Sequence, residues 1–366
     1  MDTAGHFSRS YAEARGRFLG AARARRCRMA AYVQRAARAG DGDELATDVA
    51  SFGDRAAPGV LVVSCGTHGV EGYAGSGALA AWLGDDALPR ALDGGAVRVV
   101  LVHAVNPWGF AHDARTDQDN IDVNRNFRDF TVPQPPNDGY RALHPLLVPS
   151  TWPPRLVNEL RLALRVVLRG RRATQAAIAR GQSEFADGLF YAGRAPSWSR
   201  RTLEAVFAEH VAPCRVAAWI DLHTGLGRRG VAELIANTPD TPAALAEARA
   251  FFGHDVTSMY GGHSASTEVV GANFAALRGA GAEAATAVTV ELGTRSPLAV
   301  LAALRGRQWL ANHPDAPRAR ATAICEATRQ AFYVEHDDWK NAACLAMRKA
   351  ATRALDAIGH AVQVRR

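Results

Sequence analysis

Residues 60–71 of the chain, VLVVSCGTHGVE, join a short apolar run to a histidine and a glutamate three positions apart. The run follows Pro58-Gly59 and has the length and composition of a buried strand. His68 and Glu71 come after it at a spacing that lets an imidazole and a carboxylate reach one metal ion. The stretch therefore predicts a strand that ends in a metal-binding turn.

Three further motifs follow apolar stretches later in the chain: Asp122–Phe127 (DVNRNF), Asp221–Thr224 (DLHT) and Val290–Gly293 (VELG). In the second of them, His223 can complete the ligand set begun by the first histidine and glutamate. Two histidines and one carboxylate, with a fourth position left to water, form the ligand set of a catalytic zinc site rather than of a closed structural one. Asp221 is expected to accept the second ring N–H of His223 only if the backbone curls.

Short apolar strands alternate with amphipathic helices along the chain, which predicts an α/β fold with a mainly parallel sheet covered on both faces. His68, His223 and Glu291 each come just past a predicted strand. Because ligands bind at the carboxyl ends of the strands in such sheets, these three residues are expected on one rim. The predicted strands are residues 60–64, 97–102, 216–220 and 287–290.

Helical spacing of apolar residues predicts the other elements, and no repeat or low-complexity linker separates domains. We therefore expect a single domain over residues 1–366, with an N-terminal helix and a helical tail from about residue 316. Residues 131–154 are rich in proline and turn formers and are expected to form a long loop. The other predicted helices are residues 11–38, 75–83, 156–180, 198–209 and 298–311.

The composition is that of an ordinary globular protein, with 48% apolar and 22% charged residues. No apolar run approaches the roughly 18 residues that would span a bilayer, and the first residues do not have the pattern of a cleaved signal. Five scattered cysteines argue against a disulfide framework. These features predict a cytoplasmic protein without a membrane partner.

The formal charge of +7 comes almost entirely from arginine, and no nucleic-acid-binding motif accompanies it. The densest cluster, Arg165, Arg169, Arg171 and Arg172, lies on a predicted helix and is expected to form a solvated face. We therefore expect no nucleic-acid partner, although a basic balance can steer acidic small substrates to the protein. Whether the protein is a homo-oligomer stays open.

The motifs together resemble the zinc carboxypeptidase-like superfamily, which includes the succinylglutamate desuccinylase and aspartoacylase branch, and more closely an uncharacterised bacterial subfamily of it. The resemblance covers the chain from about Tyr11 to Leu355. It is carried by residues 66–72, 106–110, 119–127, 221–227, 291–294 and 308–310, in that order. It implies a three-layer α/β/α sandwich with a mixed, mainly parallel sheet of about eight strands.

The resemblance also implies roles for individual residues. His68, Glu71 and His223 match the ligands of one Zn²⁺ ion. Glu291 matches the general base that takes a proton from the attacking water and passes it to the leaving amine. Arg115 falls where relatives carry the arginine that stabilises the oxyanion.

Substrate-binding residues follow from the same resemblance. Asn124 and Arg125 match the pair that holds the terminal carboxylate of the substrate. The mobile tyrosine of the superfamily has two candidates here, Tyr260 and Tyr191. Val70 stands where digestive-type relatives have an arginine, so contacts with the substrate are expected to differ there.

Each assignment has a simpler alternative. His68 can be a histidine at a helix start beside a surface glutamate, and Glu291 can cap a helix that follows its strand. Arg125 can form a structural ion pair in a polar turn, and Arg115 can be a solvated loop residue. The occurrence of all the motifs in order favours the metal site over these alternatives.

The sequence therefore predicts a zinc-dependent hydrolase that cleaves an amide bond, either a carboxypeptidase-like peptidase or a small-molecule deacylase. Its substrate is expected to be a small molecule or peptide bearing a carboxylate. An esterase or desuccinylase-type enzyme is the alternative within hydrolases. A catalytically inactive binding protein on the same fold is a further alternative, but it would require a lost ligand or base, and all four residues are present.

Overall fold

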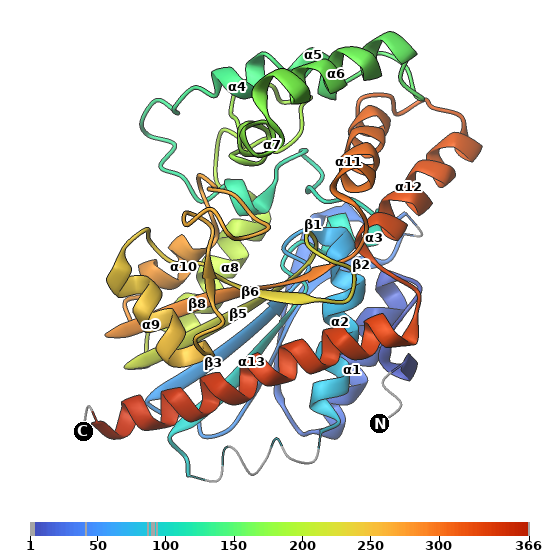
Figure 1. Cartoon of the computed structure of the whole chain (residues 1–366). Helices are drawn as coiled ribbons and strands as arrows, with labels where there is room; N and C mark the ends of the chain where they lie inside the picture. The colour runs from blue at the N-terminus through green and yellow to red at the C-terminus, as the bar shows by residue number, and fades with distance from the viewer. Residues whose placement is uncertain (1–3, 41, 86–87, 89–91, 93, 365–366) are drawn as a thin grey trace.

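The computed structural model describes residues 4–40, 42–85, 88, 92 and 94–364. Its centre is one sheet of eight strands in the order β1-β2-β4-β3-β5-β8-β6-β7 (Figure 1). The strands are β1 (Arg28–Arg38), β2 (Glu44–Phe52), β3 (Gly59–Cys65), β4 (Val97–His103), β5 (Val216–Gly225), β6 (Ala232–Ala236), β7 (Thr257–Ser258) and β8 (Ala284–Gly293).

The middle of the sheet is parallel, since β4, β3, β5 and β8 all run in one direction. β1 and β2 form an antiparallel pair at one edge, and β6 runs antiparallel to β8 near the other. The expected mixed, mainly parallel sheet of about eight strands is confirmed. The parallel middle brings the carboxyl ends of β3, β5 and β8 to the same end of the sheet, which is where the candidate metal ligands are expected.

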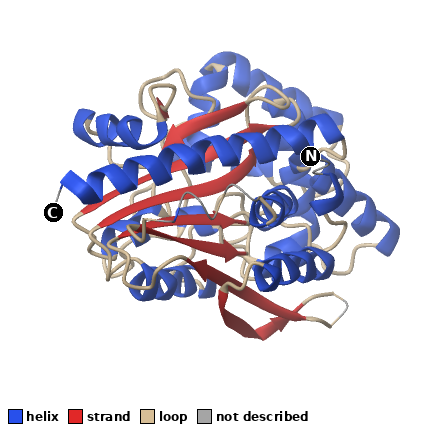
Figure 2. Cartoon of the chain, turned by 90° about the horizontal axis from the view of Figure 1, so that it is seen from below, coloured by secondary structure: helices blue, strands red, loops and turns tan. Residues whose placement is uncertain are grey.

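Helices cover both faces of the sheet (Figure 2). The longer ones are α1 (Tyr11–Ala24), α2 (Gly72–Leu83), α6 (Leu156–Arg169), α7 (Arg171–Ala179), α8 (Trp198–His210), α9 (Pro242–Phe252), α11 (Pro297–Ala311), α12 (Arg318–Phe332) and α13 (Asp337–Val364). The short ones are η1 (Ala4–His6), η2 (Gly69–Glu71), α3 (Pro107–Ala111), η4 (Val123–Arg125), α4 (Asp138–Arg141), α5 (His144–Leu147) and α10 (Phe274–Gly279).

Alternate residues of the central strands enter two separate hydrophobic cores, as the pleat of a strand requires. On one face, Leu61 and Ile220 join side chains of α1, α2, α9 and α13. On the other face, Val60 and Trp219 join side chains of α8 and α10. Because both faces are covered, these strands are apolar throughout rather than alternating, and this confirms the expected three layers.

The predicted helix over residues 11–38 is wrong in its second half. α1 ends at Ala24, Arg26 takes a positive φ of 58°, and residues 28–38 form β1. This strand pairs antiparallel with β2, with Ala30 opposite Val49. The alanines and arginines favour a helix by intrinsic propensity, but pairing with a neighbouring strand outweighs so weak a preference.

Two other expectations also need correction. The predicted loop over residues 131–154 contains the short helices α4 and α5. The predicted helix over residues 156–180 is two helices, because Gly170 takes a φ of 84° between α6 and α7. The predicted helical tail is confirmed as α12 and α13.

Two other expectations concern cysteines and the membrane. None of the five cysteines, all of which lie among the described residues, forms a disulfide. Among the described residues, none of the helices combines the length and the apolar character that a membrane crossing needs.

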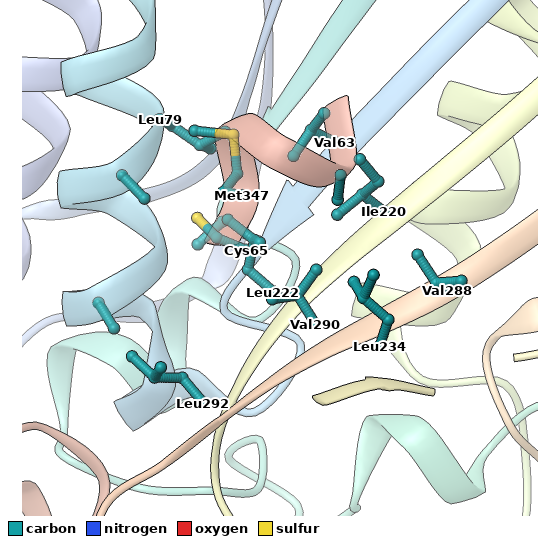
Figure 3. Packing of buried hydrophobic residues seen from close by; sticks show 14 of the residues in the cluster. Val63, Cys65, Leu79, Ile220, Leu222, Leu234, Val288, Val290, Leu292 and Met347 are labelled. Atoms are coloured by element: carbon teal, nitrogen blue, oxygen red, sulfur yellow. The ribbon is translucent and has the colours of Figure 1, made fainter. Parts of the chain in front are cut away.

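α13 packs across the sheet through an apolar side that includes Met347 (Figure 3). Met347 is buried, whereas Leu345 of the same helix is 61% exposed. Met347→Ala is expected to lower the free energy of unfolding by about 2–5 kcal/mol, because the cavity it leaves adds to the lost burial. Urea unfolding followed by circular dichroism measures this change.

Leu345→Ala is the matched control and should change the free energy of unfolding by no more than about 0.5 kcal/mol. Equal losses for the two variants would contradict the packing of α13 described here.

Candidate metal centre

The turn after β3 places the first two candidate ligands side by side. Gly66 takes a φ of 67°, a left-handed conformation that glycine adopts readily, and turns the chain at the end of the strand. The backbone N–H of Glu71 donates to the carbonyl of His68 at 2.9 Å and closes the turn η2. As a result, Nδ1 of His68 lies 2.9 Å from Oε1 of Glu71, and both side chains are buried.

The third candidate ligand, His223, lies within β5 rather than past its end, because the strand continues to Gly225. Its Nε2–H donates to Oδ2 of Asp221 at 2.7 Å. The expectation that the backbone must curl for this contact is wrong. Residues two apart in a regular strand point to the same face, so Asp221 and His223 can bond within an ordinary strand. The bond fixes the imidazole so that Nδ1 points away from Asp221.

Nδ1 of His223 meets the first two ligands. It lies 3.1 Å from Nδ1 of His68 and 3.1 Å from Oε2 of Glu71. All three residues are buried, and their ligand atoms lie within 4.8 Å of one another. Burial opposes ionisation of Glu71, but the two histidines outweigh it and lower the pKa of this carboxyl.

This donor set fits a metal ion. With Nε2 of His223 donating to Asp221, Nδ1 is the ring atom that offers a lone pair once the ring is neutral, and it faces a second ring nitrogen and a carboxylate. Three electron-pair donors held this close repel one another unless a cation or a shared proton lies between them. Nitrogen, nitrogen and carboxylate oxygen are the donors that a catalytic Zn²⁺ ion takes from a protein.

Asp122 links the ligands to Arg115. Oδ2 of Asp122 accepts a hydrogen bond from Nε of Arg115 at 2.9 Å, and Oδ1 lies 3.4 Å from Nε2 of His68. Nη1 of Arg115 lies 3.5 Å from Oε1 of Glu71. Arg115 is therefore not the solvated loop residue of the alternative interpretation, since its guanidinium lies beside the candidate ligands.

Glu291 lies next to His223 on the neighbouring strand, where the parallel register pairs the two residues. Its Oε1 accepts the backbone N–H of Leu226 at 2.8 Å, so the carboxylate is held in place without being a member of the ligand cluster. Burial, and then the negative charge of Glu71, raise the pKa of Glu291 to about 7. The alternative that it only caps a helix is wrong, because Glu291 lies inside β8.

Asn124 and Arg125 lie in η4, beside the same site. Oδ1 of Asn124 accepts the backbone N–H of Asn273 at 3.0 Å. Arg125 is buried, and its Nε and Nη1 donate to the carbonyls of Ala179 and Asn124 at 2.7 and 2.8 Å. Burial lowers the pKa of Arg125 to about 10.

Arg115 and Arg125 also share one aromatic neighbour. Their guanidinium carbons lie 4.9 and 5.4 Å from the centre of the Phe190 ring, at distances where a cation is attracted to an aromatic face. Two positive groups thus lie around Asp122, next to the candidate ligands.

The two tyrosines are placed differently. Tyr191 is buried, and its carbonyl accepts the backbone N–H of Asp122 at 2.8 Å. Tyr260 is 37% exposed in the loop after β7. Within the described part of the chain, neither hydroxyl contacts the ligand cluster, so the role of either tyrosine stays a prediction.

Several residues that hold the site had no assigned role at the sequence level. Asp221 Oδ1 accepts hydrogen bonds from Oγ of Ser64 and Oγ1 of Thr67, at 2.6 and 3.0 Å. Asp221 Oδ2 also accepts one from Nδ2 of Asn273 at 2.7 Å. Asp122 and Thr67 lie inside the motifs of the sequence, so their position could have indicated a role in the site. Asn273 lies outside every motif, so its sequence position gave no such indication.

The family of the chain can now be stated. Residues 7–346 match the model of a family described as a protein of unknown function, DUF2817. The chain belongs to the DUF2817 family. A comparison of this DUF2817 protein with the curated proteins found no match.

The DUF2817 protein is also similar to solved structures. Carboxypeptidase A from Helicoverpa armigera is 13% identical, with 88% of this chain and 74% of that chain covered and a TM-score of 0.43. Bovine thrombin-activatable fibrinolysis inhibitor is 11% identical, with 96% and 98% covered and a TM-score of 0.48. A metallo-carboxypeptidase from Burkholderia cenocepacia is 14% identical, with 87% and 66% covered and a TM-score of 0.37. All three scores lie below 0.5.

The ligand cluster predicts that the DUF2817 protein binds one equivalent of zinc. His223→Ala is expected to abolish binding, because it removes one of three ligands and leaves the cores untouched. Elemental analysis after zinc addition and desalting measures the bound metal, and circular dichroism checks the fold.

His254→Ala is the matched control, since His254 is exposed and lies outside the cluster, and this variant should keep its zinc. A wild-type protein that holds well under half an equivalent after zinc addition would show that the cluster is not a metal site.

Proposed function

We propose that this protein is a zinc-dependent hydrolase that cleaves an amide bond in a substrate bearing a carboxylate. The observation that carries the proposal is the position of the buried carboxylate of Glu291 on β8, next to His223 of the three-residue ligand cluster but outside that cluster. A metal-ligand set beside an unligated carboxylate is what hydrolysis by water needs, because one group must activate the water and another must take its proton.

His68, Glu71 and His223 would hold the ion. When bound there, zinc would lower the pKa of water toward about 7 and polarise the scissile carbonyl. Asp221 supports this by accepting the Nε2–H of His223, which leaves Nδ1 free to ligate. Hydrogen bonds of this kind to a ligating histidine set its orientation and basicity.

Glu291 would act as the general base. Its Oε1 is occupied by the backbone N–H of Leu226, and its Oε2 accepts no hydrogen bond from the described residues. Oε2 is therefore the atom expected to take a proton from the attacking water and to deliver it to the leaving nitrogen. Oε1 meanwhile keeps the carboxylate in position.

The two arginines would bind the charges of the substrate. Arg115 uses Nε for Asp122 and keeps its Nη groups near the ligand cluster, where they can donate to the carbonyl oxygen as it gains negative charge. Arg125 is held by carbonyls through Nε and Nη1, and its Nη2 donates to none of the described residues. A planar guanidinium held in this way can still bind a carboxylate through its two Nη groups.

Glu291→Gln is expected to lower kcat by about 10²–10⁴, because glutamine keeps the shape but cannot accept a proton. Zinc content and KM should change little, since Glu291 is not a ligand. Hydrolysis of a panel of N-acyl amino acids, dipeptides and matching esters by the zinc-loaded enzyme measures the effect and separates amidase from esterase activity.

Glu283→Gln is the control for this substitution, because Glu283 precedes the opposite end of β8 and is 56% exposed in an ion pair with Arg215. It should leave kcat unchanged. Loss of zinc in Glu291→Gln would make Glu291 a ligand, and near-normal turnover would place the base elsewhere.

Arg125→Lys is expected to raise KM roughly tenfold or more with a smaller change in kcat, because a point charge replaces a planar fork and uniform binding is lost. The matched measurement compares a free-acid substrate with its carboxamide in both proteins. The wild type should already hydrolyse the carboxamide poorly, and the variant should hydrolyse it only slightly more slowly. Equal turnover of acid and amide by the wild type would give Arg125 another role.

A further inference from the structure

α6 carries its apolar side outward. Six of its leucines and valines are between 50% and 78% exposed: Leu156, Val157, Leu160, Leu164, Val167 and Leu168. They recur at the three- and four-residue spacing of one helical face, and we call them the α6 apolar stripe. An amphipathic helix of a globular protein normally turns this face to the core, but in α6 only Leu162 is buried.

The outward orientation is held by contacts on the opposite side of the helix. Glu159 pairs with Arg305 of α11 at 2.8 Å, and Leu162 packs into the core with Leu147. The same arginine donates to the carbonyl of Leu146, which ties α5, α6 and α11 together. α6 lies along the outer edge of the molecule, beside α5 (Figure 1).

The charge of residues 155–172, the segment that carries the α6 apolar stripe, is predominantly positive. All six arginines between residues 155 and 172 are exposed, and Arg161 and Arg165 border the stripe within α6 itself. Glu159 is the sole acidic residue of this segment, and it is already paired with Arg305. This segment therefore combines exposed aliphatic side chains with an excess of positive charge.

We propose that α6 docks this protein on a membrane surface that carries anionic headgroups, with the α6 apolar stripe in the boundary between headgroups and acyl chains. An exposed helix with an aliphatic face and arginines beside it has the composition of an interfacial helix. The charge favours anionic lipid over a second copy of the chain, because two such faces would bring arginines together without acidic partners. This docking replaces the expectation of no membrane partner and does not depend on the proposed hydrolase activity.

The composition of the α6 apolar stripe also favours lipid over a protein partner. The stripe holds only leucine and valine, and both are under-represented among the residues that dominate the energy of protein interfaces. Docking would leave the protein on the surface of the bilayer, in keeping with the lack of a described helix that could cross it.

The test is sedimentation of the full chain with vesicles of one part phosphatidylglycerol to two parts phosphatidylcholine, compared with phosphatidylcholine alone. We expect binding to the anionic vesicles that falls as salt is added, because headgroup attraction is screened. Leu160→Glu should weaken the partition coefficient by about tenfold or more, since a buried apolar side chain becomes a charge that the lipid repels. Arg161→Gln should weaken it about fivefold.

Leu345→Glu is the matched control, because Leu345 on α13 is 61% exposed, as is Leu160, but lies outside α6. It should bind vesicles as the wild type does. Failure of the folded wild type to bind anionic vesicles would overturn the proposal, and so would equal losses in Leu160→Glu and Leu345→Glu. A wild-type dimer in size-exclusion chromatography that Leu160→Glu converts to a monomer would show that a second copy covers the stripe instead.

Discussion

The buried carboxylate of Asp221 is the interaction on which the candidate site depends. A carboxylate taken out of water is very costly unless hydrogen bonds replace its hydration. Asp221 here accepts hydrogen bonds from four side chains, those of Ser64, Thr67, Asn273 and His223. These donors come from β3, the turn after it, the segment before α10 and β5, so one charge holds together four parts of the chain.

The hydrogen bonds to Asp221 also decide which way the candidate metal ligands point. Because Nε2 of His223 is used for Asp221, Nδ1 of that ring is presented to Glu71 and His68. Asp122 plays a similar part for His68: it accepts a hydrogen bond from Arg115 and lies near the Nε2 atom of His68. Asp221 and Asp122 thus lie behind the candidate ligands His223 and His68, and each carboxylate limits how its neighbouring imidazole can turn.

The parallel middle of the sheet supplies the frame for this arrangement. The register of β5 and β8 sets His223 beside Glu291, and β3 leads into the turn that carries His68. Packing on both faces keeps these strands in register, since a slip of one residue would exchange the side chains of the two cores. α7 and α11 lie beyond the carboxyl ends of the central strands (Figure 1). There the carbonyl of Ala179 accepts a hydrogen bond from Arg125, and Arg305 pairs with Glu159 of α6, so Arg125 and the exposed helix belong to one side of the molecule.

The sequence by itself determined the elements whose signals are local: the apolar central strands, and the motif residues directly after or within them. Because strand, turn and ligand are neighbours in the chain at His68 and Glu71, their spacing alone was informative. Tertiary structure decided what depends on remote partners. Residues 28–38 became a strand only by pairing with β2, Asn273 reached Asp221 only through the fold, and the apolar side of α6 turned outward because its contacts with α11 lie on the other side. Propensity and periodicity describe a segment, whereas pairing and orientation depend on the surface against which it lies.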